Sequence, residues 1–208
     1  MESMGAPGES RMERKKNETR QKIIEAAMDL FQRQGFGNTT MEQIAETADI
    51  ARKTLYNHFP VKEAIVDEYV KVISMGLAQE TLDNLRNLPD TGTRLMAVLD
   101  KAYAWVETNP EITGICLGYR LKCMSLGSGD CSGETGTKIM MTEIIRQGQQ
   151  AGEIRQDFSV ELMVEQLNIS RCVIVLNWLK DPSRFELRKE MAKMVDLFIY
   201  GAIERKES

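Results

Sequence analysis

The apolar residues of the chain recur at spacings of three and four almost throughout, which is the period of an amphipathic helix. The first clear stripe ends just before Gly35, a residue type that commonly terminates helices. It consists of Ile23, Ile24, Ala27, Leu30 and Phe31. No run of residues shows the sustained alternation of apolar and polar positions that marks a half-buried strand. The pattern therefore predicts an all-α protein.

Two short helices are predicted after this stripe. The sequence Thr-Met-Glu-Gln at residues 40–43 matches a capping box, in which the threonine hydroxyl and the glutamine side chain bind backbone N–H groups left free by the first turn. A turn over residues 48–51 leads to a helix over residues 52–59, which Pro60 stops because the residue before a proline disfavours the helical region. This order of short helix, tight turn and second helix is typical of a helix-turn-helix.

The rest of the chain also has the helical period. Breaks rich in Gly, Pro, Asn, Asp and Ser separate the segments. The predicted helices are Lys62–Asn87, Arg94–Thr108, Glu111–Met124, Thr137–Ala151, Val160–Leu179 and Phe185–Ile203. The Gly/Ser-rich interval Ser125–Gly136 is expected to be a surface loop.

The helix over residues 52–59 has an outward face suited to DNA. Leu55 and Phe59 turn inward, and the groups left outside or at the rim are Arg52, Lys53, Thr54, Tyr56, Asn57 and His58. Arginine and lysine match guanine acceptors, asparagine pairs with adenine, and hydroxyl groups reach phosphates. The alternative is an ordinary solvated helix, which would favour Glu/Lys pairs. No acidic residue occurs between Ala51 and Lys62, so the pattern favours a recognition helix.

The charge is unevenly distributed along the chain. The formal net charge is −4, which would argue against nucleic-acid binding if it were uniform. Between Arg11 and Lys62, however, ten Lys/Arg stand against seven Asp/Glu, whereas residues 63–208 hold seventeen against twenty-two. Positive charge is therefore concentrated in the segment that holds the helix-turn-helix.

A longer set of residues surrounds this motif. In chain order it contains Thr19-Arg20-Gln21-Lys22-Ile23-Ile24-Glu25-Ala26-Ala27, Leu30-Phe31, Gly35-Phe36, Thr39-Thr40, Ile44-Ala45, Ala48 and Thr54-Leu55-Tyr56-Asn57-His58-Phe59-Pro60-Val61-Lys62-Glu63-Ala64. The set resembles the DNA-binding head of the tetracycline-repressor (TetR/AcrR) family. Two positions depart from the family pattern. The usual glycine of the turn is Asp49, and the usual Ser/Thr cap of the recognition helix is Ala51, which has no capping side chain.

The resemblance implies roles for individual residues. Those expected at phosphates are Thr39, Thr40 and Lys62. Those expected at the DNA backbone or groove are Lys53, Tyr56 and His58. Arg52, Thr54 and Asn57 remain the candidates for base reading. The basic segment with Arg11, Arg14, Lys15 and Lys16 is either an arm that reaches the adjacent minor groove or a frayed charged tail.

We therefore predict three segments. Residues 1–16 form a disordered basic arm, residues 17–62 a three-helix helix-turn-helix DNA-binding domain, and residues 63–208 a helical ligand-binding and dimerisation domain.

The last two predicted helices are strongly apolar. Val173-Ile174-Val175-Leu176 is apolar on every side, so its helix is expected to be buried all round. The final helix carries a stripe of Leu187, Met191, Met194, Val195, Phe198 and Ala202. The resemblance implies that two such helices from each subunit form the four-helix interface of a homodimer. The alternative is that the stripe packs only within its own subunit.

The resemblance also implies an effector pocket among the middle helices. Thirteen methionines are many for this length and suit an adaptable apolar cavity, so we expect an apolar or amphipathic small molecule. The candidate contact residues are Tyr103, Trp105, Tyr119, Met124, Met141, Arg171 and Trp178. Further polar groups that could orient a ligand are Arg120, Asn168 and Asn177.

Other chemistries are disfavoured. His58 is the single histidine, which excludes a multi-histidine metal site, and the cysteines lack the Cys-x2-Cys spacing of a zinc site. The residues form no catalytic constellation, so we expect no enzyme, no metal and no cofactor. No stretch approaches the roughly 18 apolar residues of a membrane span, and we expect a cytoplasmic protein without membrane contacts. Its four thiols, Cys116, Cys123, Cys131 and Cys172, are expected to be reduced.

The sequence thus predicts a ligand-responsive transcriptional regulator, most simply a repressor. It is expected to bind a palindromic double-stranded DNA operator as a homodimer and to be released by a small-molecule effector. The alternative is a DNA-binding regulator that senses redox state through Cys123 or Cys131.

Overall fold

The computed structural model describes residues 10–85, 87–126 and 134–201, and within these ranges it is helical with no strand. The all-α prediction is confirmed. The chain divides into two compact units, Met1–Tyr69 and Val70–Ser208, which are described separately below. The division falls inside α4 (Lys62–Leu85), so one continuous helix belongs to both units.

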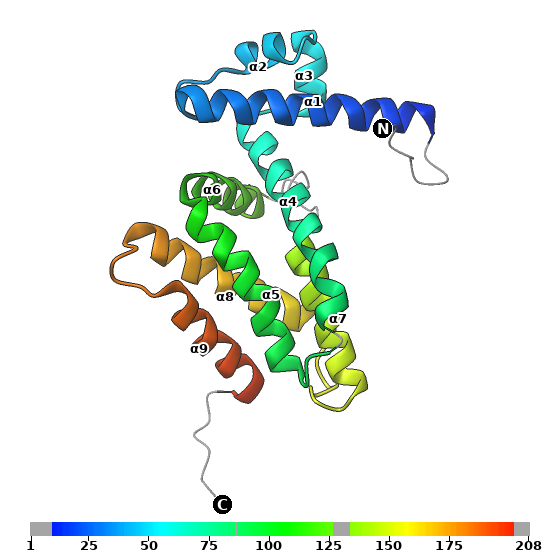
Figure 1. Cartoon of the computed structure of the whole chain (residues 1–208), viewed down its shortest axis with the longest axis vertical. Helices are drawn as coiled ribbons and strands as arrows, with labels where there is room; N and C mark the ends of the chain where they lie inside the picture. Colours follow the sequence, from blue (N-terminus) through cyan, green and yellow to red (C-terminus); the bar gives the residue numbers. More distant parts are fainter. Residues whose placement is uncertain (1–9, 86, 127–133, 202–208) are drawn as a thin grey trace, which may run out of the picture. The chain divides into compact units, whose positions relative to one another are not determined.

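The N-terminal unit consists of α1 (Arg11–Gln34), α2 (Met41–Thr47), α3 (Arg52–His58) and the first two turns of α4 (Figure 1). The predicted stripe on α1 forms its base, with Ile23 and Ala27 fully buried. Ile44 of α2 and Leu55 of α3 are also fully buried. Each short helix thus contributes an apolar anchor, which is how helices too short to be stable alone are held in place.

The start of α1 corrects one expectation. Residues 1–16 were expected to be a disordered arm, but Arg11–Lys16 lie in the first turns of α1. The cause is a capping box that sequence reasoning overlooked. The Glu13 N–H donates to Ser10 Oγ at 3.2 Å, and the Ser10 N–H donates to the Glu13 carboxylate at 3.1 Å, so two free backbone donors of the first turn are bound. Residues 1–9 lie outside the described residues.

The helix-turn-helix follows the predicted local rules. The Gln43 N–H donates to Thr40 Oγ1 at 3.2 Å and the Thr40 N–H donates to Gln43 Oε1 at 2.9 Å, which confirms the capping box of α2. Asp49 has a left-handed backbone, with φ at 52°, in the turn position where glycine was noted as usual. Ala51 precedes α3 without any side-chain cap.

The C-terminal unit is a helical body. Its core is made of α5 (Thr91–Thr108), α7 (Gly136–Gln150), α8 (Val160–Lys180) and α9 (Leu187–Tyr200). Helices α5 and α8 each pack against both α7 and α9, and α6 (Pro110–Leu126) packs on α8 (Figure 1). The buried centre includes Leu99, Met141, Ile145 and Leu167. The helix bounds agree with the sequence prediction to within about three residues.

Two glycines allow close helix approaches in this body. A Cβ built on Gly136 would lie 2.0 Å from the backbone oxygen of Ser74 on α4, and the Gly136 N–H donates to Ser74 Oγ at 3.0 Å. A Cβ on Gly148 would lie 2.3 Å from Thr91 Oγ1 on α5. Only a residue without a side chain fits at either point.

The packing of α8 and α9 differs from the prediction. Leu187, Met191, Met194 and Val195 are buried in the core of their own subunit, because this face of α9 lies against α5 and α8. Helix α8 is not buried all round in the single chain, since Val173 is 51% exposed. Ala202 lies outside the described residues.

A different set of apolar side chains is exposed on these two helices. It consists of Leu162, Ile169 and Val173 on α8 and Leu197 and Tyr200 on α9. A groove of about 900 Å³ runs beside them, with Leu162, Ile169 and Leu197 in its lining. In the part of the chain that the structure describes, no helix has the length and apolarity that a membrane span requires.

Candidate functional site

Helix α3 presents a polar surface to the solvent. Arg52, Lys53, Tyr56 and Asn57 are exposed, whereas Thr54 and His58 are half-buried at the rim. Leu55 and Phe59 turn into the core, with exposed fractions of 0% and 2%. The predicted division of this helix into an inward and an outward face is therefore what the structure has.

Arg20 of α1 holds the end of α3 in place. Its guanidinium lies 4.5 Å from the centre of the Phe59 ring, forms an ion pair with Glu68 at 2.9 Å, and donates to the His58 carbonyl at 3.5 Å. One side chain thus links α1, the end of α3 and α4. Sequence reasoning missed this role, because Arg20 lies outside the apolar stripe and its partners are some forty residues away.

Lys62 makes a second link of this kind. Its ammonium donates to the carbonyls of Phe36 and Thr39 at 2.6 and 3.0 Å and lies 4.3 Å from the centre of the Phe36 ring. Two of its three donors are therefore used within the protein. The expected phosphate contact of Lys62 stays a prediction, and the observed role is to fasten the α1–α2 connection to the start of α4.

The two threonines before α2 differ in their availability. Thr39 is 1% exposed and its hydroxyl donates to the Gly35 carbonyl at 2.9 Å, so it shapes the connection. Thr40 is exposed and its hydroxyl accepts the capping bond of α2. Of this pair, Thr40 is the residue that a phosphate could reach.

His58 is held in its neutral form. Burial lowers the pKa of His58 from its ordinary value of 6.5, and the positive charges of Arg20 and Lys16 lower it further. Its Nδ1 atom is buried without a hydrogen-bond partner. Near neutral pH this position therefore offers a hydrogen-bonding ring at the rim of α3 rather than a fixed positive charge.

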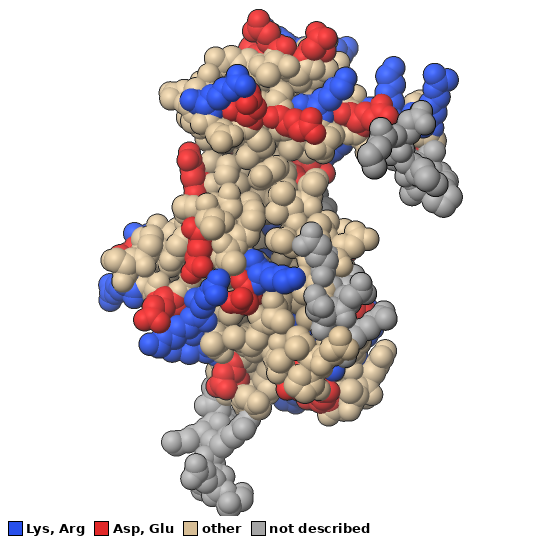
Figure 2. All heavy atoms as spheres, in the orientation of Figure 1, with Lys and Arg blue, Asp and Glu red and all other residues tan. Residues whose placement is uncertain are grey.

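Acidic and basic side chains are interspersed on the face that Figure 2 displays, instead of forming one continuous basic patch. The positive groups most relevant to DNA are the exposed Arg52 and Lys53 on α3.

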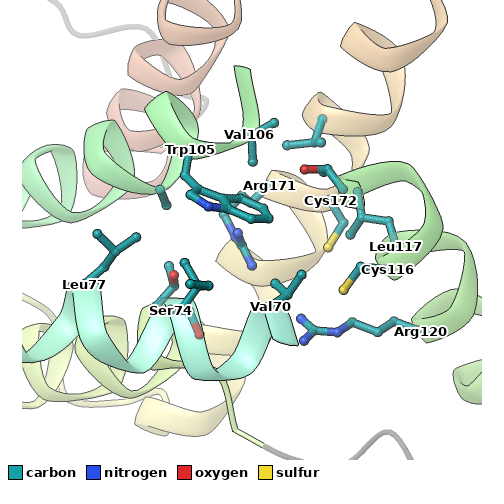
Figure 3. Close-up of a pocket in the computed structure, with 15 residues that line it drawn as sticks. Val70, Ser74, Leu77, Trp105, Val106, Cys116, Leu117, Arg120, Arg171 and Cys172 are labelled. Atoms are coloured by element: carbon teal, nitrogen blue, oxygen red, sulfur yellow. The ribbon is translucent and has the colours of Figure 1, made fainter. Parts of the chain in front are cut away.

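The C-terminal unit contains a partly open cavity of about 70 Å³ that is lined by residues of five helices. Helix α4 contributes Val70, Ile73, Ser74 and Leu77. Helix α5 contributes Ala102, Trp105 and Val106, and α6 contributes Thr113, Cys116, Leu117 and Arg120. The remaining lining residues are Thr137 of α7 and Arg171, Cys172 and Val175 of α8 (Figure 3). The wall is mainly apolar, with two guanidinium groups.

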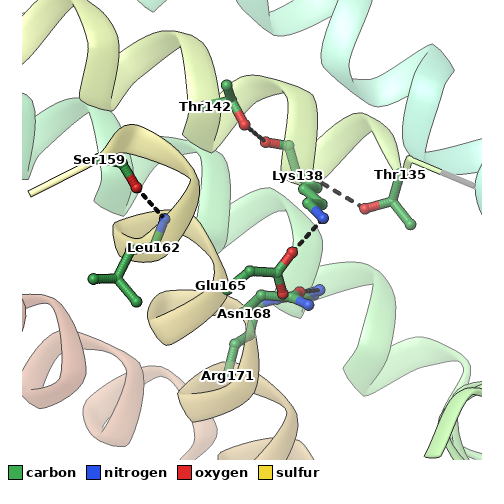
Figure 4. A network of polar contacts seen from close by, with 8 residues as sticks. All are labelled: Thr135, Lys138, Thr142, Ser159, Leu162, Glu165, Asn168 and Arg171. Carbon is green, nitrogen blue, oxygen red and sulfur yellow. Dashed lines mark hydrogen bonds and ion pairs between the residues drawn. The ribbon is translucent and has the colours of Figure 1, made fainter. Parts of the chain in front are cut away.

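Arg171 is positioned by its own helix. Its Nη2 atom donates to Asn168 Oδ1 at 3.0 Å, and its Nε atom is buried without an acceptor. Next to this pair, Lys138 of α7 forms an ion pair with Glu165 of α8 (Figure 4), so this carboxylate is already matched to another cation.

The expected effector-binding residues occupy different environments. Trp105 and Arg171 line the cavity. Tyr103, Met141 and Trp178 are buried in the core and are not among its lining residues, Tyr119 is half-buried, and Met124 is 66% exposed. The α4 residues of the lining were missed because their spacing is that of any buried helix face.

The cysteines also differ from one another. Cys116 and Cys172 are thiols in the cavity wall. Cys123 is disulfide-bonded, which corrects the expectation that this residue is reduced. Cys131 lies outside the described residues.

Known proteins share both the motif and the fold. Residues 23–69 match the family model described as "Bacterial regulatory proteins, tetR family". The chain is 24% identical over 197 residues to the probable acrEF/envCD operon repressor of Escherichia coli K12, an alignment that covers 86% of this chain and 84% of that protein.

Two solved structures are similar over most of their length. Thermus thermophilus FadR, a TetR family transcriptional repressor in complex with lauroyl-CoA, has a TM-score of 0.78 at 25% identity, covering 90% of this chain and 97% of that chain. Bacillus subtilis FadR in complex with stearoyl-CoA has a TM-score of 0.62 at 19% identity, covering 88% of this chain and 99% of that chain.

The family match falls on the helices that carry the α3 surface, and the structural likeness extends over both units. Residues 23–69 therefore form a helix-turn-helix domain of the tetR type, and the chain as a whole is similar to TetR-family transcription regulators.

Proposed function

We propose that the protein is a cytoplasmic repressor that binds a palindromic operator as a homodimer and releases it when a small molecule enters the C-terminal cavity. The exposed polar face of α3 carries this proposal. Arg52 and Asn57 are solvent-exposed on a helix whose other face is anchored by Leu55. Such a helix fits the major groove, where arginine reads guanine and asparagine reads adenine.

The homodimer is supported by the exposed apolar side chains of α8 and α9. Leu162, Ile169 and Leu197 are 56%, 51% and 55% exposed and lie along one groove. Monomeric proteins rarely leave such a contiguous apolar surface in water. Two copies that pair through α8 and α9 would form a four-helix interface, and a two-fold dimer reads a palindrome with its half-sites about 34–36 Å apart.

Effector control is supported by the cavity and by α4. Val70 and Leu77 of α4 line the cavity, while the same helix begins at Lys62 in the DNA-binding unit. At about 70 Å³ the cavity is smaller than an ordinary ligand site of roughly 300–1,000 Å³. A ligand must therefore widen it, and widening moves α4. The coupling between ligand and operator is expected to be about 1–3 kcal/mol.

The relatives support the same type of effector. Two structurally similar FadR proteins are in complex with lauroyl-CoA and stearoyl-CoA, both of which are amphipathic. The apolar wall beside Trp105 and Arg171 suits a ligand of that general kind.

The test is a selection of binding sites from random duplexes, followed by binding measurements on the enriched sequence. We expect an inverted repeat bound by two chains, and an at least tenfold loss of affinity for Asn57→Ala combined with Arg52→Ala. Glu46→Ala, on the exposed surface of α2, serves as the control. No enrichment of any sequence, or an enriched site without two-fold symmetry, would contradict the proposal.

A second candidate function rests on Cys123, which is disulfide-bonded. A regulator that senses redox state would bind its operator differently before and after this bond is reduced. Operator affinity with and without a thiol reductant, in the native chain and in Cys123→Ser, decides this point. Equal affinity in all four samples excludes redox control through Cys123.

A further inference from the structure

We propose that the effector of the C-terminal cavity carries a compact anionic group, a carboxylate or a phosphate, which is bound by the Arg171 guanidinium while the apolar part of the ligand lies along α4 and α5. This inference rests on the proposed function, since it assigns the chemical class of the ligand in the same cavity. It adds the charge of the ligand, Arg171 as the residue that recognises this charge, and Asn168 as the residue that positions Arg171.

The charge of Arg171 is unmatched among the described residues. None of the described carboxylates forms an ion pair with it, and its Nε atom is buried with no acceptor. Its one hydrogen bond runs to the neutral Asn168 amide. A buried N–H without an acceptor is unfavourable, and an entering anion would remove that penalty by accepting the Nε–H of this half-buried side chain.

The charged side chains that line the cavity are of one sign among the described residues. In the part of the chain that the structure describes, the lining contains Arg120 and Arg171 and neither Asp nor Glu. Glu165, an acidic residue nearly two turns before Arg171 on α8, is paired with Lys138 (Figure 4). Among the described residues, the charged groups of the wall are therefore both guanidinium groups. A cationic ligand would meet two guanidinium groups, and an uncharged one would leave Arg171 as it is.

The apolar side chains of the cavity wall are arranged along α4 and α5. Val70, Ile73 and Leu77 recur along α4 at helical spacing, and Trp105 and Val106 of α5 face the same cavity (Figure 3). This lining accepts an alkyl or aromatic body of the ligand. A guanidinium group set in such a wall defines an amphipathic anion as the best match.

Asn168 acts as a positioning residue. Its Oδ1 atom accepts from Arg171 Nη2 at 3.0 Å, which fixes one edge of the guanidinium and leaves the Nε–H edge available. Asn168 itself is not part of the cavity lining. Its removal is therefore expected to weaken anion binding through Arg171 alone.

The test uses four ligands with the same ten-carbon chain: decanoate, decanol, decyltrimethylammonium and decanoyl-CoA. Binding to the full-length protein is measured by calorimetry, and release of the selected operator by fluorescence anisotropy. We expect decanoate to bind at least tenfold more tightly than decanol, decyltrimethylammonium not to bind, and decanoate to release the operator. Decanoyl-CoA separates a free carboxylate from a phosphate as the source of the anion.

Variants assign the effect to Arg171. Arg171→Gln is expected to weaken decanoate binding by about 10- to 100-fold, the range for a hydrogen bond to a charged group, and to change decanol binding by less than about twofold. Arg171→Lys should recover part of the loss, and Asn168→Ala should weaken decanoate by about three- to fivefold. Arg184→Gln, at an exposed position outside the cavity, is the matched control.

Several results would overturn the inference and leave the proposed function standing. They are equal affinity of the native protein for decanoate and decanol, equal weakening of both by Arg171→Gln, or operator binding without binding of any of the four ligands. If decanoyl-CoA alone binds, the anion is a phosphate, and Arg171→Gln must weaken that complex by the same factor for the inference to hold. Failure to bind any operator counts against the proposed function instead.

Discussion

The α3 surface and the C-terminal cavity are built in opposite ways. The recognition surface consists of neighbouring residues on one short helix. The period of that helix therefore determines which of its side chains are exposed. The wall of the cavity is formed by residues of five helices, α4 to α8. These lining residues lie between positions 70 and 175 of the chain. A local surface can be predicted from spacing, whereas a cavity depends on long-range packing that spacing does not specify.

The largest expected effect is a loss of stability in the C-terminal unit alone, which distinguishes this unit from the N-terminal one. Gly136→Ala places a methyl group against the Ser74 backbone, where it would lie 2.0 Å from the carbonyl oxygen. We expect the C-terminal unit to lose about 2–3 kcal/mol of unfolding free energy, measured by denaturant titration. Effector binding should fall with it, because Ser74 and Thr137 line the cavity.

Gly118→Ala is the control for this substitution, since nothing lies within 4 Å of a Cβ built at that helical position. It should stabilise the protein by up to about 1 kcal/mol. Equal effects of the two substitutions would show that the α4–α7 contact is not tight in solution.

The substitution Lys62→Met tests whether Lys62 stabilises the N-terminal unit or binds DNA. Loss of two hydrogen bonds from an ammonium should lower the stability of the N-terminal unit by about 2 kcal/mol, because the Phe36 and Thr39 carbonyls lose their donor. The salt dependence of operator binding should stay unchanged. Lys53→Ala should instead reduce that dependence by about one counterion. If Lys62→Met reduces it equally, Lys62 contacts a phosphate as the sequence predicted.

Asn57→Ala tests the prediction that α3 reads bases. We expect a loss of about 1–3 kcal/mol confined to one base pair of each half-site, with relaxed specificity there. Binding to a library of operator variants measures this directly. A uniform loss over all variants would mean that Asn57 contacts the DNA backbone.

The smallest effect concerns His58. Because burial and then the Arg20 and Lys16 charges lower its pKa below 6.5, the unfolded chain takes up a proton at higher pH than the folded chain does. The stability gained by keeping this ring neutral is fully present above pH 6.5 and is lost as the pH falls through the lowered pKa. Denaturant titrations over this range should have a pH slope that His58→Gln removes. An unchanged slope would assign it to other groups.

Sequence reasoning succeeded where one short segment determines the outcome. The capping box of Thr40 and Gln43 and the inward positions of Leu55 and Phe59 each depend on a few adjacent residues. It failed where a partner is distant: the Arg20 contacts, the Gly136–Ser74 approach and the α4 wall of the cavity all join residues far apart in the chain. It also assigned the apolar face of α9 to a partner, because an apolar stripe does not state which neighbour buries it.

The exposed apolar side chains of α8 and α9 bear on how much of this protein a cell must contain. If two copies cover this surface, each chain gains stability from its partner, and that gain falls as the chains are diluted. A regulator made in few copies would then spend part of its time as single chains that present Leu162, Ile169 and Leu197 to proteases and chaperones. The expression level of the gene would set the lifetime of its product as well as the occupancy of its operator.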